Sequence, residues 1–400
     1  MSKRRKHLLS KGAITIQEQQ SFAAEVQDLA SDGRGVVRHP NGQVYFVAGV
    51  WLGEYGEFKV IEKSGRVGSA VLVELHRACE QRIVPHCEHF ASDAGGCGGC
   101  AWQFVDYAAQ LTAKQRRVEA AAKRVDAADK LKPIVASPQI WAYRNRAQLK
   151  TDGRRLGYVA ARSNQLIDVT TCPVLSEKNQ GSLAALRDRL PCTAWLPGKK
   201  RLWLGLDIDE DTDPEQVTVH RRLPFKQGNS LQNRQMRAWL ARQLSLLSRK
   251  EVALELFCGS GNFTEVLVDA GFKQIFAAEA SQAAVAQLAA KGWGGVDACV
   301  VDLFSNQGLS ELLRRASKAS VLLLDPPREG LKLRQPLMQH LMQKSAAVEE
   351  ILYISCDVAS CFRDVADFLK VGFEIVEIQA LDLFPQTPHV ELMLAMKRRN

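Results

Sequence analysis

The chain has 400 residues, of which 46% are hydrophobic and 24% are charged. This composition is typical of folded domains and excludes a chain that is disordered throughout. Its 53 Lys and Arg residues outnumber its 44 Asp and Glu residues, and the formal net charge of +9 favours a polyanionic partner such as nucleic acid. No run of residues approaches the ~18 apolar residues of a membrane span, so we expect no membrane contact.

The N-terminal segment is basic, with Lys3, Arg4, Arg5 and Lys6, but no apolar segment follows it as in a secretory signal. We therefore expect a cytoplasmic protein, in which structural disulfides are rare. Two interpretations of the basic segment stay open: a solvated tail, or an arm that contacts RNA.

The first predicted domain covers residues 13–77 and consists of short strands. Turns such as Asp32-Gly33 and Asn41-Gly42 separate these strands. Several strands at a spacing of about ten residues predict a small β-barrel, a common shape among RNA-binding modules. The predicted strands are Phe22–Val26, Gly35–Arg38, Val44–Val47, Glu57–Ile61 and Ala70–Leu75.

The second predicted domain covers residues 78–223 and mixes helices with strands. The Ala-rich segment Ala108–Ala127 predicts a helix with several basic side chains. The segment Trp141–Lys150 interleaves aromatic and basic residues on a predicted strand. Such a pattern can bind phosphates while its rings stack on bases, although a half-buried strand would look the same.

The third predicted domain covers residues 224–400, where strands alternate regularly with helices. This alternation predicts a doubly wound parallel sheet. Ser281 is a plausible N-cap of one helix, and Gly271 follows the end of another. The last two strands, Glu374–Leu381 and Glu391–Met396, predict an antiparallel hairpin. The earlier strands are Val252–Phe257, Gln274–Ala278, Ala298–Val301, Ser320–Leu324 and Ile351–Ser355.

Polar residues follow the ends of four of these strands. The turn Glu255–Phe263 contains Gly259 and Gly261, which let the backbone approach a ligand closely. Glu279, Asp302 and Asp325 end the next three strands, where ligands of doubly wound sheets bind. The full G-x-G-x-x-G fingerprint of dinucleotide sites is absent, which argues for an adenosine ligand without a pyrophosphate, such as S-adenosylmethionine.

Two further residues are candidates for covalent chemistry. Cys356 follows an apolar strand and precedes a predicted helix, a position that predicts a lowered thiol pKa. Glu391 opens the last strand after a Pro-bounded loop, where it is either a base at the sheet edge or a solvated strand end. Cys192, Cys258, Cys299 and Cys361 are expected to be inert packing residues.

Four other cysteines suggest a metal site. Cys87, Cys97 and Cys100 lie in one glycine-rich segment, and Cys172 could complete the set from far along the chain. Four thiolates suit zinc or an iron–sulfur cluster equally well by spacing. His89 beside Cys87 offers an alternative zinc set with Cys87, Cys97 and Cys100.

Together these motifs resemble one family, the RNA uracil-5 methyltransferases that carry an iron–sulfur cluster, especially the bacterial members that act on 23S ribosomal RNA. The resemblance covers nearly the whole chain. It rests most specifically on the Ser-Cys motif at Cys356 and the His-Val-Glu motif at Glu391, with support from Tyr143–Arg146, Ser163-Asn164 and Phe225–Asn229. The first cysteine gap is longer than usual, Asp357 replaces a usual Asn, and the middle domain is shortened before Arg221.

The resemblance implies an α/β fold with a C-terminal Rossmann-like class I methyltransferase domain, an N-terminal five-stranded TRAM-like or OB-like barrel, and a mixed α+β central domain. It implies that Cys356 is the nucleophile, that Glu391 is the base, and that Cys87, Cys97, Cys100 and Cys172 hold a 4Fe–4S cluster. The implied cofactor-binding residues for S-adenosylmethionine are Gln227, Phe257, Asn262, Glu279, Asp302 and Asp325.

The implied reaction starts with addition of the Cys356 thiolate to carbon 6 of a uracil, which makes carbon 5 nucleophilic. Carbon 5 takes a methyl group, Glu391 removes the carbon-5 proton, and elimination frees Cys356. We expect a monomer that acts on 23S ribosomal RNA, with transfer RNA as the less favoured substrate. The rival interpretations are an exocyclic-amine methyltransferase suggested by Asp325-Pro326-Pro327, a non-catalytic RNA-binding protein, and a redox protein.

Overall fold

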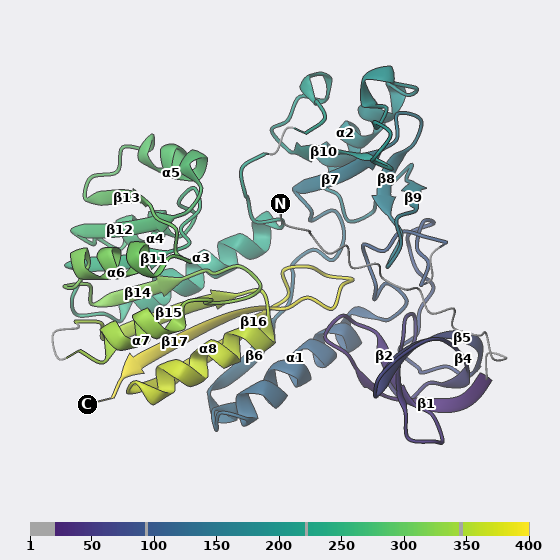
Figure 1. Cartoon of the computed structure of the whole chain (residues 1–400), viewed down its shortest axis with the longest axis horizontal. Helices are drawn as coiled ribbons and strands as arrows, with labels where there is room; N and C mark the ends of the chain where they lie inside the picture. The colour runs from purple at the N-terminus through teal and green to yellow at the C-terminus, as the bar shows by residue number, and fades with distance from the viewer. Residues whose placement is uncertain (1–20, 93–94, 221–222, 344–346, 400) are drawn as a thin grey trace, which may run out of the picture. The chain divides into compact units, whose positions relative to one another are not determined.

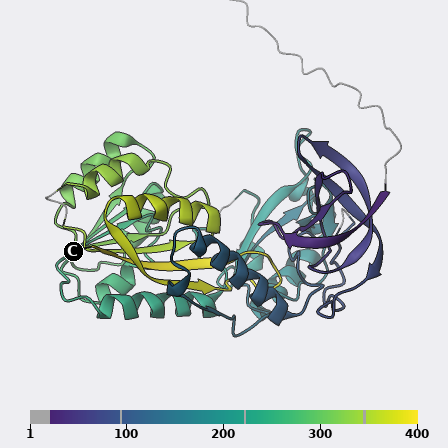
Figure 2. The ribbon, with the colours of Figure 1, turned by 90° about the horizontal axis from the view of Figure 1, so that it is seen from below.

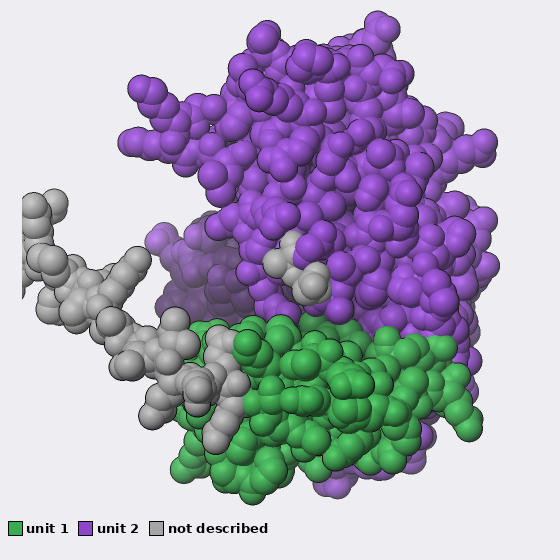
Figure 3. Space-filling model, turned by 90° about the vertical axis from the view of Figure 1, so that its right-hand side faces the viewer, with its two compact units in different colours: residues 1–82 green, residues 83–400 purple. Residues whose placement is uncertain are grey.

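The computed structural model describes residues 21–92, 95–220, 223–343 and 347–399. The chain divides into two compact units, Met1–Arg82 and Ile83–Asn400 (Figure 3). The basic residues Lys3–Lys6, the first residues of the predicted barrel domain before residue 21, and Arg221 lie outside the described residues.

The first unit contains a closed five-stranded barrel with the strand order β1-β2-β3-β5-β4, which confirms the predicted barrel (Figure 1). In β1 buried and exposed residues alternate, so that Phe22, Ala24 and Val26 face the core while their neighbours face the solvent. This period of two is the pattern of a strand with one buried face. The strands are β1 (Ser21–Leu29), β2 (Gly35–Arg38), β3 (Val44–Val47), β4 (Tyr55–Ser64) and β5 (Val67–Arg77).

The second unit contains a small antiparallel sheet with the order β10-β7-β8-β9 (Figure 1). Helix α2 (Glu177–Asp188) contributes Leu183 and Leu186 to the same core as Leu149 and Leu206 of the sheet. The strands are β7 (Arg146–Thr151), β8 (Leu156–Val159), β9 (Leu166–Asp168) and β10 (Leu204–Asp209). Short 3-10 turns lie at Ala128–Lys130, Thr193–Trp195 and Pro214–Gln216.

The prediction for Trp141–Lys150 is only partly right. The strand starts at Arg146, and Tyr143 is buried with its hydroxyl donating to the backbone oxygen of Pro385 at 3.0 Å. The Arg146 guanidinium donates to the backbone oxygens of Leu223 and Pro224. Tyr143 and Arg146 therefore make contacts within the fold, whereas Lys150 of the same segment lines a cavity of the small sheet.

The large sheet of the second unit has eight strands in the order β13-β12-β11-β14-β15-β17-β16-β6. The first five strands in this order run parallel, and β17 lies antiparallel between β15 and β16, as the sequence predicts for the closing hairpin. The strands are β6 (Leu131–Val135), β11 (Val252–Leu256), β12 (Gln274–Glu279), β13 (Val296–Val300), β14 (Val321–Leu324), β15 (Glu350–Ser355), β16 (Phe373–Leu381) and β17 (Glu391–Arg398).

Helices cover both faces of the large sheet (Figure 2). Leu254 of β11 belongs to one apolar core and its neighbour Ala253 to another, because successive side chains of a strand point to opposite faces. The first core includes α1 (Tyr107–Lys123), α6 (Asn306–Arg315), α7 (Arg334–Leu341) and α8 (Val358–Lys370). The second includes α3 (Ser230–Ser245), α4 (Thr264–Asp269) and α5 (Gln282–Ala289).

Part of the predicted middle domain belongs to this large sheet. Strand β6 pairs in parallel with β16, and α1 contributes Val118 and Ala122 to the same core as α8. Helix α1 ends at Lys123 rather than at the predicted Ala127, and Asp126 nearby has a left-handed φ of 55°, which no α-helix continues. In the described part of the chain, no helix combines the length and the apolar character that crossing a bilayer requires.

Candidate active site

The turn after β11 has an unusual backbone that exposes a space beside the sheet edge. Phe257, Gly259 and Gly261 have φ values of 65°, 55° and 92°, in the left-handed region. A Cβ atom added at Gly259 would meet nothing within 4 Å, so open space lies directly over this residue. Positive φ at the non-glycine Phe257 is uncommon, and backbone strain of this kind concentrates at functional sites.

Carboxylates from the neighbouring strands surround this turn. The Glu279 carboxylate accepts hydrogen bonds from the backbone N–H groups of Gly259 at 3.3 Å and Ser281 at 2.9 Å. Asp302 accepts from the N–H of Phe304 at 2.9 Å, and the Phe304 ring lies 5.9 Å from that of Phe257. The sequence predicts these strand ends, and the register of the parallel strands brings them to one edge.

Gln227 and Asn262 lie where the chain enters α3 and leaves the β11 turn. The Asn262 side chain exchanges two hydrogen bonds of 2.9 Å with Asn233 of α3, which fixes the orientation of its amide. Gln227 is buried, and its backbone oxygen accepts a hydrogen bond of 2.8 Å from the Asn145 amide. Gln227 therefore lies in the segment before α3, and Asn262 contacts α3 itself. Asp325, Cys356 and Glu391 lie instead at β14, β15 and β17.

The antiparallel pairing of β15 and β17 brings Cys356 next to Glu391. In this pair Ser355 is opposite Leu392, so the next residue of each chain segment, Cys356 and Glu391, continues the register. Glu391 is only 4% exposed, and this burial excludes the alternative of a solvated strand end. Two residues that are far apart in the sequence thus form one site because their strands run in opposite directions.

The pKa of Cys356 corrects a sequence-based expectation. Burial, with the negative charges of Glu391 and Asp325, raises the pKa of the thiol to about 11, although the positive charge of Arg328 acts against this. The expected lowering by the following helix, α8, does not prevail. Burial decides the sign and the carboxyl groups on adjacent strands add to it, and the sequence position of Cys356 reveals neither.

The two carboxyl groups beside Cys356 also have raised pKa values. Burial raises the pKa of Asp325 to about 7, and the charge of Glu279 adds to this effect. Burial and the charge of Asp325 raise the pKa of Glu391 as well, with Arg328 acting in the opposite direction. A carboxylate with a raised pKa is a stronger base near neutral pH, and such shifts cluster at catalytic sites.

Arg328 and His389 have no role predicted from the sequence, and both lie at this site. The Arg328 guanidinium is 3.4 Å from Nε2 of His389, and its charge acts on Cys356 and Glu391. Burial lowers the pKa of His389 to about 4, and four cations act in the same direction: Arg328, Lys114, Arg117 and Arg144. Arg328 could have been predicted as a site residue from the sequence, because it follows Asp325 by three residues in the same turn.

Helix α1 holds the loop that leads to Glu391. Lys114 and Asp382 form a fully buried ion pair of 2.5 Å, and Gln110 exchanges hydrogen bonds of 2.9 Å with the side-chain oxygen and backbone N–H of Gln386. Gln386 has a left-handed φ of 69°. The Gln110 amide also donates to the backbone oxygen of Trp102 at 3.1 Å, and thereby connects this loop to the segment that contains Cys100.

The structure brings Cys87, Cys97, Cys100 and Cys172 to the wall of one small cavity. Burial raises the pKa of Cys97 to about 11 and of Cys100 to about 12, and the neighbouring sulfurs contribute to both shifts. All ten cysteines of the chain are free thiols. The glycines between the cysteines are needed for this packing, because a Cβ atom at Gly98 would come within 2.7 Å of the backbone nitrogen of Ala161.

The spacing of these four sulfurs, all of them in described residues, does not match a single zinc ion. No three of them lie within 4.8 Å of one another, whereas a Zn–S distance of ~2.3 Å in a tetrahedron separates sulfurs by about 3.8 Å. His89 also lines the cavity, but its Nε2 accepts a hydrogen bond of 3.0 Å from the N–H of Thr170. Four thiols around one cavity are also the donor set that an iron–sulfur cluster takes.

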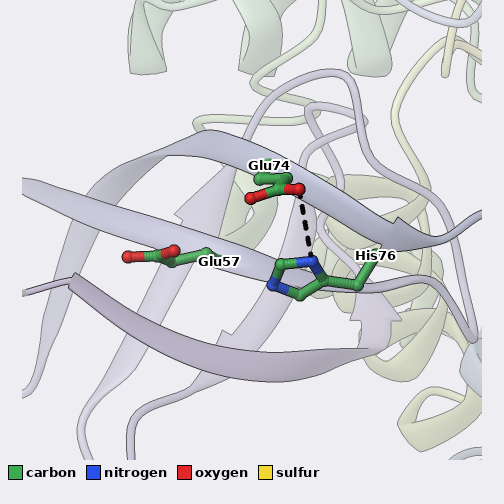
Figure 4. Close-up of side chains that lie close together, drawn as sticks. All are labelled: Glu57, Glu74 and His76. Carbon is green, nitrogen blue, oxygen red and sulfur yellow. Dashed lines mark ion pairs between the residues drawn. The ribbon is translucent and has the colours of Figure 1, made fainter.

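A different group of possible ligands lies on the barrel. Among the described residues, Glu57, Glu74 and His76 of β4 and β5 are the group whose ligand atoms all lie within 4.8 Å of one another (Figure 4). Glu74 and His76 are 3.9 Å apart as an ion pair. Both are exposed, and exposed acidic groups of this kind are common without any ion.

Comparisons with known proteins find relatives of this chain among RNA methyltransferases. The family model of the tRNA (uracil-5-)-methyltransferases matches residues 213–298. An uncharacterized RNA methyltransferase of Nitrosomonas europaea is 39% identical over 379 residues, which cover 93% of this chain and 95% of the relative. The 23S rRNA (uracil(1939)-C(5))-methyltransferase RlmD of Halomonas elongata is 28% identical, and the match covers 93% of this chain and 88% of the relative.

The fold has a counterpart among solved structures. The tRNA (uracil-54, C5)-methyltransferase of Pyrococcus abyssi, solved in complex with S-adenosyl-L-homocysteine, superposes with a TM-score of 0.67 at 20% identity. The match covers 94% of this chain and all of the other. The 39% identical relative, which is named as an RNA methyltransferase, identifies the class of this protein as a methyltransferase. The chain belongs to the RNA uracil-5 methyltransferase family and is an enzyme of that class.

Proposed function

We propose that this enzyme uses S-adenosylmethionine to methylate carbon 5 of a uridine in 23S ribosomal RNA, through a transient covalent bond from Cys356. The observation that carries this proposal is the pairing of β15 with β17, which sets a thiol beside a buried carboxyl group. Relatives named as 23S ribosomal RNA uracil-5 methyltransferases support the choice of substrate.

Carbon 5 of neutral uracil is a poor nucleophile, and Cys356 changes this. The thiol gives its proton to the solvent, and the thiolate adds to carbon 6 and breaks the carbon 5–carbon 6 double bond. The electron pair released at carbon 5 would form the new carbon–carbon bond to the methyl group, and the electron pair of the broken sulfur–methyl bond would stay on the sulfur of the donor. Glu391 accepts the proton that carbon 5 still carries, the double bond re-forms, and the carbon–sulfur bond breaks.

The charges around Cys356 explain why the thiol stays protonated in the free enzyme and how its thiolate is stabilised during the reaction. In the free enzyme the raised pKa keeps sulfur protonated near neutral pH. Arg328 is the cation that favours both the thiolate and the Glu391 carboxylate. A uracil bound beside Arg328 places the negative charge that develops on the ring oxygen near this cation.

S-adenosylmethionine, when bound, supplies the methyl group. The residues that we propose to hold it are Gln227, Phe257, Asn262, Glu279, Asp302 and Asp325. The open space over Gly259 and the carboxylates at the ends of β12 and β13 support this assignment, because carboxylates at these positions bind ribose hydroxyls in doubly wound folds. Asp325, with its raised pKa, lies between this region and Cys356.

We propose that Cys87, Cys97, Cys100 and Cys172 hold a 4Fe–4S cluster, which their position around one small cavity supports. No step of the proposed reaction transfers an electron, so the cluster serves the fold. Its thiolates would fix the segment from Cys97 to Trp102, whose backbone contacts Gln110 and Gln386. We further propose that the TRAM-like barrel and the small sheet bind RNA, in three domains with boundaries near residues 78 and 224.

Methylation assays with purified protein test the substrate directly. Total 23S ribosomal RNA and bulk transfer RNA from a strain lacking the protein are incubated with S-adenosylmethionine that carries a labelled methyl group. We expect label in 23S ribosomal RNA, recovered as 5-methyluridine by mass spectrometry of nucleosides. Label in transfer RNA alone would replace the proposed substrate by the one named for the family model, and label in an exocyclic amine would contradict the proposed chemistry.

A further inference from the structure

The small sheet carries a cavity that the proposed reaction does not use. Its volume is about 410 Å³, within the range of small-molecule sites. Lys150 of β7 and Gly205 of β10 line it, together with Asn164, Arg201 and Trp203. These residues come from the central part of the chain and not from the edge of the large sheet where Cys356 lies.

The walls of this cavity combine an aromatic ring with positive charge. The Lys150 ammonium lies 4.6 Å from the centroid of the Trp203 ring. The Arg201 guanidinium lies 3.4 Å from both ring nitrogens of His220, which also lines the cavity. An aromatic face next to cations is the arrangement with which proteins bind single-stranded nucleic acids.

The acid in the wall is already neutralised by its neighbours. Asp207 is buried, and its carboxylate accepts hydrogen bonds from Gln148 at 2.9 Å and Arg146 at 3.2 Å. The backbone N–H of Leu223 donates to the same carboxylate at 3.3 Å. Asp207 therefore holds its neighbours in place at the cavity wall. Lys150 and Arg201 give the cavity the positive charge that an anionic ligand meets.

Trp203 also carries an unsatisfied donor. Its indole N–H is buried and donates to no acceptor in the part of the chain that the structure describes. A buried N–H group without an acceptor costs ~1–3 kcal/mol, and such groups often mark places where a partner completes the structure.

We propose that this cavity binds one unstacked nucleotide of the RNA substrate, outside the target uridine, with its base against Trp203 and its phosphate near Lys150 and Arg201. The proposal rests on the proposed function and deepens it, because it adds a second contact that positions the RNA. Enzymes that need a base out of its stack gain from holding a neighbouring nucleotide, since the strand is then already unstacked.

Gly205 provides a way to fill the cavity without disturbing the fold. A Cβ atom added at Gly205 meets only Nζ of Lys150, at 3.6 Å, which is an ordinary contact. A leucine there extends into the cavity from a strand whose conformation accepts any residue. Gly181 of α2 is the matched control, because a Cβ atom there meets nothing within 4 Å and the residue does not line the cavity.

The experiment uses the full-length protein and two readouts. The first is the Kd of a fluorescein-labelled oligouridylate of about twelve nucleotides, from fluorescence anisotropy at low salt. The second is the KM and kcat for 23S ribosomal RNA from a strain lacking the protein. We expect Gly205→Leu to raise both Kd and KM by about tenfold with kcat unchanged, and Gly181→Leu to change neither.

Trp203 variants protect the test against a folding artefact. Trp203→Ala should raise Kd by about as much as Gly205→Leu, whereas Trp203→Phe, which keeps an aromatic face, should restore most of the affinity. If Gly205→Leu and Trp203→Ala both bind the oligouridylate as tightly as the parent protein, the proposal is wrong. If the parent protein binds the oligouridylate but methylates no 23S ribosomal RNA, the proposed function is wrong, and the Kd values still decide whether the cavity binds RNA.

Discussion

Two sets of buried charged groups lie at opposite ends of the same loop, residues 382–391, and they are built differently. At its start Asp382 is paired with Lys114, and both side chains are fully buried in direct contact. At its end Glu391 lies near the Cys356 thiol and Asp325, two further acidic groups, with Arg328 as the nearby cation. The first set is compensated charge for charge, whereas acids outnumber cations in the second.

This difference separates a structural role from a chemical one. A buried ion pair with a 2.5 Å contact between Lys114 and Asp382 holds the loop in place. In the second set, burial and then the charges of neighbouring acidic groups raise the pKa values of Asp325 and Glu391. Helix α1 supplies the rigid end of the loop, and the β15–β17 pair supplies the reactive end.

Removing the thiol should have the largest effect on activity. Cys356→Ala leaves no nucleophile for carbon 6, so we expect methylation to fall by at least about 10⁴-fold, to the detection limit. Labelled methyl transfer to 23S ribosomal RNA measures this. Cys192→Ala, which removes a half-buried cysteine that packs against the core of the small sheet, is the control and should retain full activity. Normal turnover by Cys356→Ala would contradict the assignment of the nucleophile.

Breaking the compensated pair should reduce stability more than chemistry. Lys114→Met leaves Asp382 buried without its partner, and we expect the free energy of unfolding to fall by about 3–5 kcal/mol. Urea titration followed by circular dichroism gives this value. Lys123→Met removes a lysine at the exposed end of the same helix, where its pair with Glu119 is solvated, and should change stability by less than about 0.5 kcal/mol.

If Lys114→Met were as stable as Lys123→Met, the ion pair would not be what anchors the loop. The claim that the Lys114–Asp382 pair has a structural role would then be wrong. The claim that Cys356 and Glu391 form the reactive site would be unaffected, because it depends on the pairing of β15 with β17.

The reactivity of Cys356 toward iodoacetamide should follow its raised pKa. Below a pKa of about 11 the thiolate fraction increases about tenfold per pH unit, so the alkylation rate should rise steeply from pH 7 to pH 9 without a plateau. Asp325→Asn removes one negative neighbour and should lower the pKa, which raises the rate at pH 8 several-fold. Peptide mass spectrometry identifies the alkylated cysteine.

Asp302→Asn is the control for this measurement, because Asp302 caps the turn at Phe304 on another strand. It should leave the alkylation rate of Cys356 unchanged. A plateau near pH 7 in the parent protein would show that the thiol is ionised at rest and that the carboxyl groups do not control it.

The smallest expected effect concerns Gln110, a positioning residue that acts through Gln386. Gln110→Ala leaves the backbone N–H and side chain of Gln386 without these partners, and we expect kcat to fall about threefold to tenfold with little change in KM. Gln115→Ala, further along α1, is the control. A purely structural role would change thermal stability and leave kcat unchanged.

The sequence predicts well where the strands of the large sheet end, but it predicts poorly how the pKa values of the side chains there are shifted. Alternating apolar segments locate β11, β12, β14 and β15, so strand periodicity alone is enough to predict Glu279, Asp325 and Cys356 at one edge. The Cys356 pKa is raised first by burial and then by the acidic groups that face it across strands, and local sequence carries no information on either. Local sequence likewise does not reveal that α1 and β6 belong with the large sheet, because their segment is far from the other strands in the sequence.

The cysteine cavity is a second feature that local sequence predicts only in part. Cys97 and Cys100 are recognisable as a pair from their spacing, and the resemblance adds Cys172. The fold confirms their proximity through long-range contacts such as the bridge of Cys97 with Ala160. In the small sheet, Trp203 and Gly205 belong to no recognisable motif, because their cavity exists only after β7 and β10 have paired.

The covalent bond between Cys356 and the RNA is the most direct test of the account. Glu391→Gln keeps the nucleophile but removes the base, so methylated RNA should stay attached to the protein. After incubation with S-adenosylmethionine and 23S ribosomal RNA, nuclease digestion and peptide mass spectrometry should find a 5-methyluridine nucleotide on the peptide that contains Cys356. An adduct on another residue, or none in a Glu391→Gln protein that binds RNA normally, would contradict the account.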